Sequence, residues 1–416
     1  LAGSGIPATK RKLLAFTDNR QDAALQAGHF NDFLFIGLLR GGILRAVQKA
    51  GDEGLSDEEF GLRVGRALGF TADNPAARKF WMADADLATV QRKNAETALT
   101  KVLAHRVWTD LRRGWRFTNP SLSVLKLIRV DYVGLNDLAQ DGALMADTSA
   151  LLGKLDPAQR EAVLRAILDA FLEGLAVDTE SLDTTILEGI SQNSRSHLRD
   201  PWAMDLSEKP RGFTAFMLTP PPKKDTRLAD ELTLIRGGPR SRLARIINRK
   251  SVLGEKLKGD DYMHFMESVL AMLTTEGLIR PVGTWQDRPG WRLIPSAVRL
   301  CPGEALKDAS AAGNPYFHQL YTGIARDLAD GKAAFMGLEG REHTAQVKQE
   351  QREWREWRFR AEDEDLANIA ANQAEMRAGQ EPTSFLPALF CSPTMELGVD
   401  ISALNAVYLR NVPPTP

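Results

Sequence analysis

Apolar positions near the N-terminus change from a strand pattern to a helix pattern. Residues 13–17 form a short apolar run with the length of a fully buried strand. Residues 20–35 then place Ala23 and Ala27 at helical spacing, and Asp18 can cap the start of this helix. Because a buried strand that feeds a helix is half of a βαβ unit, this part of the chain predicts an α/β fold.

A helical period dominates the chain from about residue 33 to about residue 175. The apolar spacing predicts helices over residues 38–49, 57–68, 75–81, 87–111 and 157–175. Inside this helical domain, the sequence Arg-Arg-Gly-Trp-Arg forms a basic, aromatic turn. It is either a solvated turn between helices or a place where Trp115 stacks on a base.

The next stretch loses its apolar pattern and then becomes basic. Residues 179–232 contain a polyproline-prone segment and are interpreted as a linker or a long surface excursion. Residues 236–258 follow with eight basic side chains against one acidic side chain, Glu255. Any attraction to nucleic acid or another polyanion is expected to be local to such a segment.

A helix and a hairpin follow the basic segment. Residues 260–276 carry an apolar stripe at helical spacing and end at Gly277. Two strand-like runs, residues 278–282 and 291–294, flank a polar turn that contains Trp285. This order is similar to a winged helix, which often binds duplex DNA but also serves as a packing or protein-docking module. Trp285 is either a strand-separating side chain or a half-buried packing residue.

The C-terminal part returns to an α/β pattern. Helices are expected over residues 315–328 and over the highly charged residues 348–362. Residues 362–382 are acidic and polar and are expected to be a mobile excursion. Strands are expected at three apolar runs, which are residues 333–336, 386–391 and 406–409.

Composition narrows the class of protein. A chain of 416 residues is too long for a single core and indicates two or more domains. The net charge of −1 gives no overall attraction to DNA or membranes, and two cysteines with six scattered histidines provide no disulfide framework or metal site. The sequence has neither a membrane-spanning apolar stretch nor a signal-peptide pattern, so we expect a soluble protein of the reducing cytoplasm that contacts no membrane.

Two sequence blocks, residues 16–22 and 392–401, lie at the ends of expected strands. Ligands gather at the carboxyl ends of strands in parallel α/β sheets. In the second block, the hydroxyl of Ser392 or Thr394 can donate to a phosphate, Gly398 permits close approach to the backbone, and Asp400 can accept from a ribose hydroxyl. The same spacing also suits a capped turn between a strand and a helix. No phosphate loop, dinucleotide-binding glycine motif, nucleophile elbow or zinc-protease motif is present in the sequence.

Three ordered segments resemble parts of superfamily 2 helicases. The first block lies within LLAFTDNRQDAA, which resembles motif IV, and the second lies within SPTMELGVDI, which resembles motif V. REHTAQV with the arginine-rich helix after it is similar to the segment that follows the next strand of these enzymes. Together they resemble the second RecA-like lobe of a DEAD/DEAH-box-type helicase, of the kind found in bacterial DNA repair and phage defence. The match covers residues 10–35 and 331–416, with weaker similarity over residues 112–132.

The resemblance implies roles for individual residues. Ser392 and Thr394 would contact nucleic-acid phosphates, and Gly398 and Asp400 would face ATP between two lobes. His343 and Arg352 would line or support the same face, although helix capping and solvation explain them equally well. The residues expected beside the nucleic-acid strand are Phe16, Thr17, Asp18, Asn19 and Arg20.

The sequence also departs from the helicase pattern. The first lobe, with its phosphate loop and magnesium-binding motif, is absent, and the chain stops where motif VI should begin. We therefore expect no catalytic residue and no ATP hydrolysis from this chain alone, while ATP and Mg would belong to an intact parent that contains the first motor lobe. DNA binding is the activity expected of the chain itself.

The expected fold is α/β, a RecA-like parallel-sheet lobe interrupted by a large, mostly helical insertion that ends in a winged-helix-like unit. The lobe would comprise residues 1–40 and 301–416, with the helical insertion at 41–235 and the basic segment and winged-helix-like unit at 236–300. The rival interpretation is a non-catalytic DNA- or protein-docking module on a degenerate lobe, and a repair or defence protein is a further expected partner. Four side chains would extend the DNA track, which are Arg240, Arg242, Arg245 and Arg249.

Overall fold

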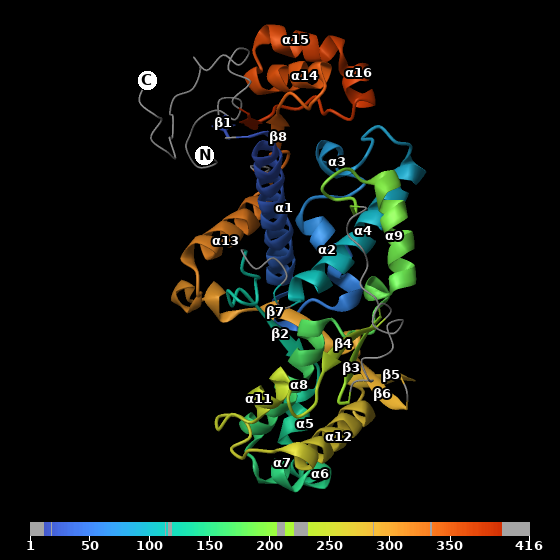
Figure 1. Ribbon diagram of the computed structural model, residues 1–416, viewed down its shortest axis with the longest axis vertical. Helices are drawn as coiled ribbons and strands as arrows, with labels where there is room; N and C mark the ends of the chain where they lie inside the picture. Colours follow the sequence, from blue (N-terminus) through green and yellow to red (C-terminus); the bar gives the residue numbers. More distant parts are fainter. Residues whose placement is uncertain are drawn as a thin grey trace. The chain divides into compact units, whose positions relative to one another are not determined.

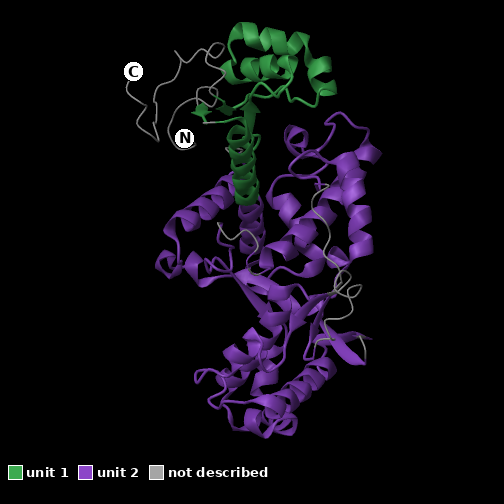
Figure 2. Ribbon diagram, in the orientation of Figure 1, with its two compact units in different colours: residues 1–38, 333–416 green, residues 39–332 purple. Residues whose placement is uncertain are grey.

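The computed structural model places helices and strands throughout most of the chain (Figure 1). The described residues are 12–17, 19–112, 114, 119–205, 213–219, 232–285, 287–332 and 335–392. They form a mixed α/β structure with two compact units (Figure 2). Unit 1 comprises residues 1–38 and 333–416, and unit 2 comprises residues 39–332.

Unit 1 contains a three-stranded parallel sheet. Its strands are β1 (Leu13–Phe16), β9 (Ala388–Cys391) and β8 (Gly340–His343), in the order β1-β9-β8. Phe16 is in register with Cys391, which is in register with His343. Two segments that lie far apart in the sequence are therefore neighbouring strands of one sheet.

Helix α1 (Arg20–Ala50) covers one face of this sheet. Ala23 and Ala27 pack against Ala388 and Phe390 of β9. The side chain of Asn19 accepts a hydrogen bond from the Asp22 amide at 2.9 Å and so caps the first turn, while the expected cap, Asp18, lies outside the described residues. The helix continues without a break through the two stretches that the sequence divided between residues 35 and 38.

Three further helices complete the described part of unit 1. These are α14 (Gln349–Arg360), α15 (Asp363–Ala371) and α16 (Gln373–Ala378). Phe359 of α14 packs with Leu389 and Cys391, which point to the face of β9 opposite to that covered by α1. The expected mobile excursion at residues 362–382 is wrong, because Ile369 of α15 and Met376 of α16 are buried against Trp354.

The strand expected at residues 333–336 is also wrong where the structure describes it. Phe335 and Met336 lie in a turn, and the strand in this region is β8. Residues 333–334 and the strand expected at 406–409 lie outside the described residues.

Unit 2 is mostly helical. Its described helices are α2 (Phe60–Ala67), α3 (Pro75–Trp81), α4 (Thr89–Leu111), α5 (Leu135–Gln140), α6 (Gly142–Thr148), α7 (Ala150–Lys154), α8 (Pro157–Gly174), α9 (Thr184–His197), α11 (Arg242–Ile247), α12 (Gly259–Thr275) and α13 (Pro315–Ala329), together with the last part of α1. These segments include the five helices that the apolar spacing predicted between residues 38 and 175, although the first is the second half of α1.

Two sheets cross unit 2. The strands are β2 (Ile128–Tyr132), β3 (Phe213–Met217), β4 (Leu232–Arg236), β5 (Ile279–Trp285), β6 (Arg288–Leu293) and β7 (Val298–Pro302). β2 pairs with β7, and the larger sheet has the order β4-β3-β6-β5. The predicted hairpin is present as β5 and β6, but it is half of a four-stranded sheet.

The linker expected over residues 179–232 is wrong for its described part. Helix α9 and strand β3 lie within it, and Ala215, Phe216 and Met217 of β3 are buried. Because β3 pairs with β4 and β6, this segment belongs to the core of unit 2.

The two cysteines are unpaired and buried. Cys301 lies in β7 and Cys391 in β9. Burial raises the pKa of the Cys391 thiol to about 12 and also raises the pKa of Cys301. Both thiols therefore act as small core residues.

Candidate nucleic-acid interface

The carboxyl ends of the three unit 1 strands meet at one edge of the sheet. Thr17 follows β1, Ser392 follows β9 and Thr344 follows β8. The Thr17 amide donates to the Cys391 carbonyl at 3.0 Å, which holds the ends of β1 and β9 together. This edge is where a parallel α/β sheet offers polar groups to a ligand.

Burial divides the residues of this edge into two groups. Thr17, Ser392 and His343 are buried, whereas Phe16 is 56% exposed and Asn19 and Arg20 are exposed. The Thr17 hydroxyl lies 2.8 Å from the Asn19 carbonyl and 3.3 Å from that of Cys391, so its proton is used within the protein. A nucleic-acid strand at this edge would meet Phe16, Asn19 and Arg20 first.

His343 is held in place by a carboxylate on α14. Its Nε2 lies 2.8 Å from Glu356 Oε1. Because a carboxylate only accepts, Nε2 carries the proton in neutral His343 and Nδ1 is left as an acceptor. Nδ1 is buried and has no hydrogen-bond partner among the described residues. His343 therefore offers no exposed surface to a ligand.

The arginine-rich helix α14 directs two arginines into the core of unit 1. Arg355 Nε lies 3.2 Å from Glu381 Oε2, and Arg358 forms ion pairs with Glu381 and Glu339. Arg358 also donates to the Ser384 carbonyl at 2.7 Å. Arg352, which the sequence placed near the ligand face, is half-buried on the same helix. The buried pairs thus fix α14 and, through it, Glu356 and His343.

Several predicted site residues lie outside the described residues. They are Asp18, Trp115, Thr394, Gly398 and Asp400. Trp285 is the last residue of β5. The structure therefore brings together Phe16, Thr17, Asn19, Arg20, His343 and Ser392 from the set predicted for unit 1.

Unit 2 carries a separate basic surface, defined by the eight lysines and arginines of residues 236–258. All eight side chains are exposed. Helix α11 presents Arg242 and Arg245 while it buries Leu243 and Ile247. The side chain of Asn248 closes the following loop, because its amide donates to the Leu257 carbonyl at 3.0 Å and its oxygen accepts from the Leu257 amide at 2.8 Å.

The helix next to the basic surface has the opposite character. Helix α12 contains no lysine or arginine, and its acidic residues Asp260, Asp261 and Glu267 are exposed. An apolar groove of about 690 Å³ lies between α12 and the β5–β6 hairpin, and Met263, Ala271 and Trp291 contribute to its lining. Exposed cations favour contact with a phosphate backbone, whereas exposed carboxylates such as those of α12 disfavour it.

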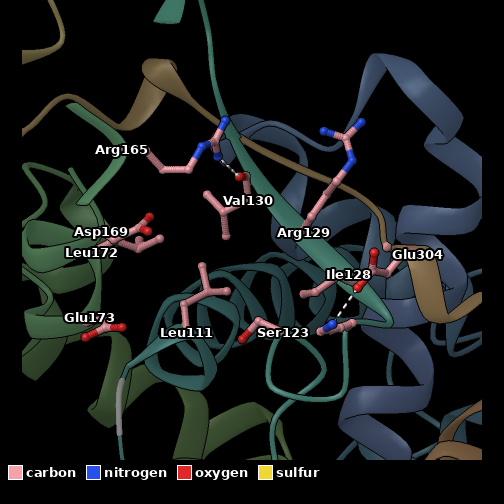
Figure 3. Close-up of a pocket in the computed structure, with 12 residues that line it drawn as sticks. Leu111, Ser123, Ile128, Arg129, Val130, Arg165, Asp169, Leu172, Glu173 and Glu304 are labelled. Atoms are coloured by element: carbon pink, nitrogen blue, oxygen red, sulfur yellow. Dashed lines mark hydrogen bonds and ion pairs between the residues drawn. The ribbon is translucent and has the colours of Figure 1, made fainter. Parts of the chain in front are cut away.

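A second pocket of unit 2 was not foreseen from the sequence (Figure 3). It has a volume of about 410 Å³, and its lining comes from α8, β2, the last residue of α4 and the loops near residues 123 and 304. The spacing of Asp169 and Glu173 places both on one face of α8, but no short motif links them to β2, about forty residues earlier in the chain.

The described residues contain no group of three or more His, Cys, Asp or Glu side chains arranged to hold a metal ion. Among the described helices, none combines the length and apolar character that a membrane crossing requires. No protein-family model, curated protein or solved structure matches the sequence or fold of this chain.

Proposed function

We propose that this chain is part of an ATP-dependent DNA helicase or translocase and that its own contribution is to bind nucleic acid. The observation that carries the proposal is the parallel pairing of β1 with β9, which places Thr17 beside Ser392 at one edge of a sheet. The two sequence blocks that resemble helicase motifs IV and V begin at these strand ends. Such an edge suits a ligand that carries phosphates.

Each part of the edge has a proposed role. Phe16 offers an exposed ring for contact with a base, and Arg20 offers a cation for a phosphate. His343, which Glu356 orients, supports the edge from within the protein. Ser392 and Thr394 are proposed for phosphate contact.

ATP would be held between this lobe and another motor lobe. Gly398 and Asp400 are proposed for the ATP-facing side, with Mg supplied to the intact parent. The described residues of unit 1 contain no lysine-bearing phosphate loop that could cradle the triphosphate. The role proposed for this chain is therefore to bind the nucleic-acid strand, with ATP hydrolysis left to the intact parent.

The basic surface of unit 2 is proposed as the main electrostatic contact with DNA. Arg240, Arg242, Arg245 and Arg249 are all exposed on it. Arg242 also pairs with Glu173, but both side chains are partly exposed, and exposed ion pairs are weak enough to exchange for a phosphate contact. Cations of this kind release counterions from DNA when they bind phosphates.

Salt dependence tests this proposal. The affinity of the chain for labelled duplex DNA is measured over a range of salt concentrations. The slope of log affinity against log salt is expected to be about −0.9 per phosphate contacted. Replacing four arginines of the basic surface by alanine should reduce the magnitude of this slope by about 3.6, which is four times 0.9, and weaken binding at low salt. The four substitutions are Arg240→Ala, Arg242→Ala, Arg245→Ala and Arg249→Ala.

A matched variant controls for the loss of four positive charges. Its replaced side chains are exposed residues of unit 2 that lie outside the basic surface, which are Arg66, Lys79, Lys93 and Lys101. This control should keep most of the affinity and slope of the unchanged chain. Equal effects of the two variants, or unchanged binding after replacement of the four arginines, would overturn the DNA-binding assignment.

A docking function is the second candidate, and the groove beside α12 favours it. Met263 and Trp291 line this apolar groove. Its charged lining consists of two acids, Glu267 and Asp287, and one cation, Arg288, so acids predominate. Such a groove suits an amphipathic, basic segment of a partner protein better than it suits DNA. A chain that shows no salt-dependent DNA affinity would favour this docking module over the motor lobe.

A further inference from the structure

The pocket beside α8 combines an apolar interior with charged walls. Leu111, Val130 and Leu172 contribute apolar lining, while Asp169 and Glu173 project from α8 (Figure 3). We call this 410 Å³ space the α8 pocket. Its size lies within the usual range for small-molecule sites, about 300 to 1,000 Å³.

Asp169 is the one carboxylate of the α8 pocket that forms no ion pair with a described residue, although the charge of Arg165 lies nearby. Tyr132 donates its hydroxyl proton to Asp169 Oδ1 at 2.8 Å. Among the described residues, no ion pair joins Asp169 to a lysine, arginine or histidine, whereas the other two carboxylates of the lining, Glu173 and Glu304, are both paired. Burial raises the pKa of Asp169 above the ordinary value of an aspartate, although Tyr132 and the nearby charge of Arg165 oppose the shift. The carboxylate therefore has unused capacity to accept a hydrogen bond in a partly desolvated position.

Three cations, Lys126, Arg129 and Arg165, contribute to the lining of the α8 pocket. Lys126 and Arg129 line it with side chains that are 56% and 51% exposed. Lys126 lies 2.7 Å from Glu304, and Arg129 pairs with Asp131. These exposed pairs are weak and can exchange for a ligand phosphate, whereas a small alkyl cation would be repelled by the same side chains.

An uncharged amine on a flat ring, joined to a phosphate, matches both sets of groups. Cytosine and adenine carry such an exocyclic amine, and a carboxylate can accept from it, while thymine offers no amine. We propose that the α8 pocket binds an aminated nucleobase, with Asp169 accepting from its exocyclic amine and with Arg129 and Lys126 contacting its phosphate. The base comes either from an unstacked nucleotide of a strand or from a free nucleotide.

A contact with the basic surface favours the strand as the source. Glu173, which lines the α8 pocket, forms an ion pair with Arg242 of α11. A strand that follows the basic surface thus passes beside the pocket, and one unstacked base can enter it. The assignment of a nucleic-acid strand as the source of the base rests on the proposed DNA-binding function. The recognition of an aminated base by the α8 pocket does not rest on it.

The test compares two oligonucleotides of equal length at about pH 8, because a high pH favours the ionised form of a carboxyl whose pKa is raised by burial. The complete chain should bind oligodeoxycytidylate at least about fivefold more tightly than oligothymidylate. Asp169→Asn should bring this ratio close to one, because an amide can turn to present either a donor or an acceptor. Arg129→Gln changes an exposed side chain with little risk to folding. It should weaken the binding of both oligonucleotides and leave the ratio of their affinities unchanged.

Asp147→Asn serves as the control, because Asp147 is an exposed acid of unit 2 that does not line the pocket. Its ratio should equal that of the unchanged chain. If both oligonucleotides bind with a ratio near one, or if Asp169→Asn keeps the ratio, binding of a strand base in the α8 pocket is excluded while the DNA-binding function stands.

Mononucleotides separate the two sources. If neither oligonucleotide binds, the DNA-binding function fails. Titration with deoxycytidine and thymidine monophosphates then shows whether the α8 pocket binds a free nucleotide. Preference for the cytidine nucleotide that Asp169→Asn abolishes supports a free-nucleotide site. Lack of this preference overturns the inference.

Discussion

Arg40 joins four segments of unit 2 through one guanidinium group. Its Nε donates to Asp110 of α4 at 2.9 Å, and its Nη1 donates to Tyr321 of α13 at 2.9 Å and to the carbonyls of Asn119 and Pro120 at 2.8 and 3.0 Å. Arg40 is fully buried and Asp110 is 4% exposed. Of the four groups that accept from Arg40 in these hydrogen bonds, only Asp110 is negatively charged. The position of α1 against α4 and α13 therefore depends on the ion pair between Arg40 and Asp110.

Replacing Asp110 should expose this dependence. Asp110→Asn removes the carboxylate that pairs with the buried Arg40. It is expected to lower the free energy of unfolding by about 3 to 5 kcal/mol, because the charge of Arg40 stays buried without an anion. Urea denaturation followed by circular dichroism measures the change. Arg63→Gln breaks the exposed pair of Arg63 with Glu59 and should cost less than about 1 kcal/mol. Similar losses in the two variants would contradict the role given to the buried pair.

At the level of elements, α2 and α4 lie in backbone contact at Gly61. A Cβ atom at this position would lie 1.9 Å from the carbonyl oxygen of Thr100. By contrast, a Cβ atom at Gly28, on the exposed side of α1, would meet no atom within 4 Å. The same substitution thus has opposite physical consequences in the two helices.

Gly61→Ala is expected to force α2 and α4 apart and to lower the free energy of unfolding by at least about 1 to 3 kcal/mol. Gly28→Ala should raise it by about 0.5 to 1 kcal/mol, because alanine favours the helix more than glycine does. Thermal or urea unfolding of both variants tests the contrast. A stabilised Gly61→Ala variant would show that the two helices can separate without loss.

The sequence predicted elements with a strong apolar period and missed those without one. Helix α12 and the β5–β6 hairpin were predicted from their periods and turn residues. Strand β8 was missed because its residues, Gly-Arg-Glu-His, carry no apolar pattern, and its pairing with β9 alone makes it a strand. Helices α15 and α16 were missed because a few buried residues, such as Ile369 and Met376, hold a mostly polar segment in place.

The candidate site was predictable only in part for a similar reason. The pattern of strands indicated that Thr17 and Ser392 would follow strands of an α/β sheet, and β1 and β9 are neighbours. Burial was not visible in the sequence, so Thr17, His343 and Ser392 were expected beside the ligand although all three are buried. The α8 pocket was missed because its lining comes from segments that no short motif connects.

On the scale of the whole molecule, the sheet of unit 1 is formed by strands that are separated by all of unit 2. Leu13 is in register with Ala388, and unit 2 comprises residues 39–332. Within unit 2, Gly41 of α1 lies against Ile324 of α13, so a folded unit 2 holds these two segments together. Folding of unit 2 therefore shortens the loop that must close before β1 can pair with β9.

We expect unit 2 to gain protection first during refolding. In pulse-labelling hydrogen exchange, amides of α4 and α8 should become protected before those of β1 and β9, because closing the complete loop by chance costs about 5 kcal/mol of chain entropy. Asp110→Asn should delay the protection of both groups of amides, because it destabilises unit 2. Earlier protection of β1 and β9 would indicate that the sheet forms without help from unit 2.

The burial of both cysteines makes it possible to attach fluorescent dyes at chosen positions of the protein. Cys301 and Cys391 are shielded from reagents, and their raised pKa values keep the reactive thiolate scarce at neutral pH. A cysteine introduced at an exposed position of each unit would accordingly accept a fluorescent dye while the native thiols stay unmodified. Donor and acceptor dyes placed in this way would report how the separation of the two units responds to a nucleic-acid strand, with no need to remove either natural cysteine.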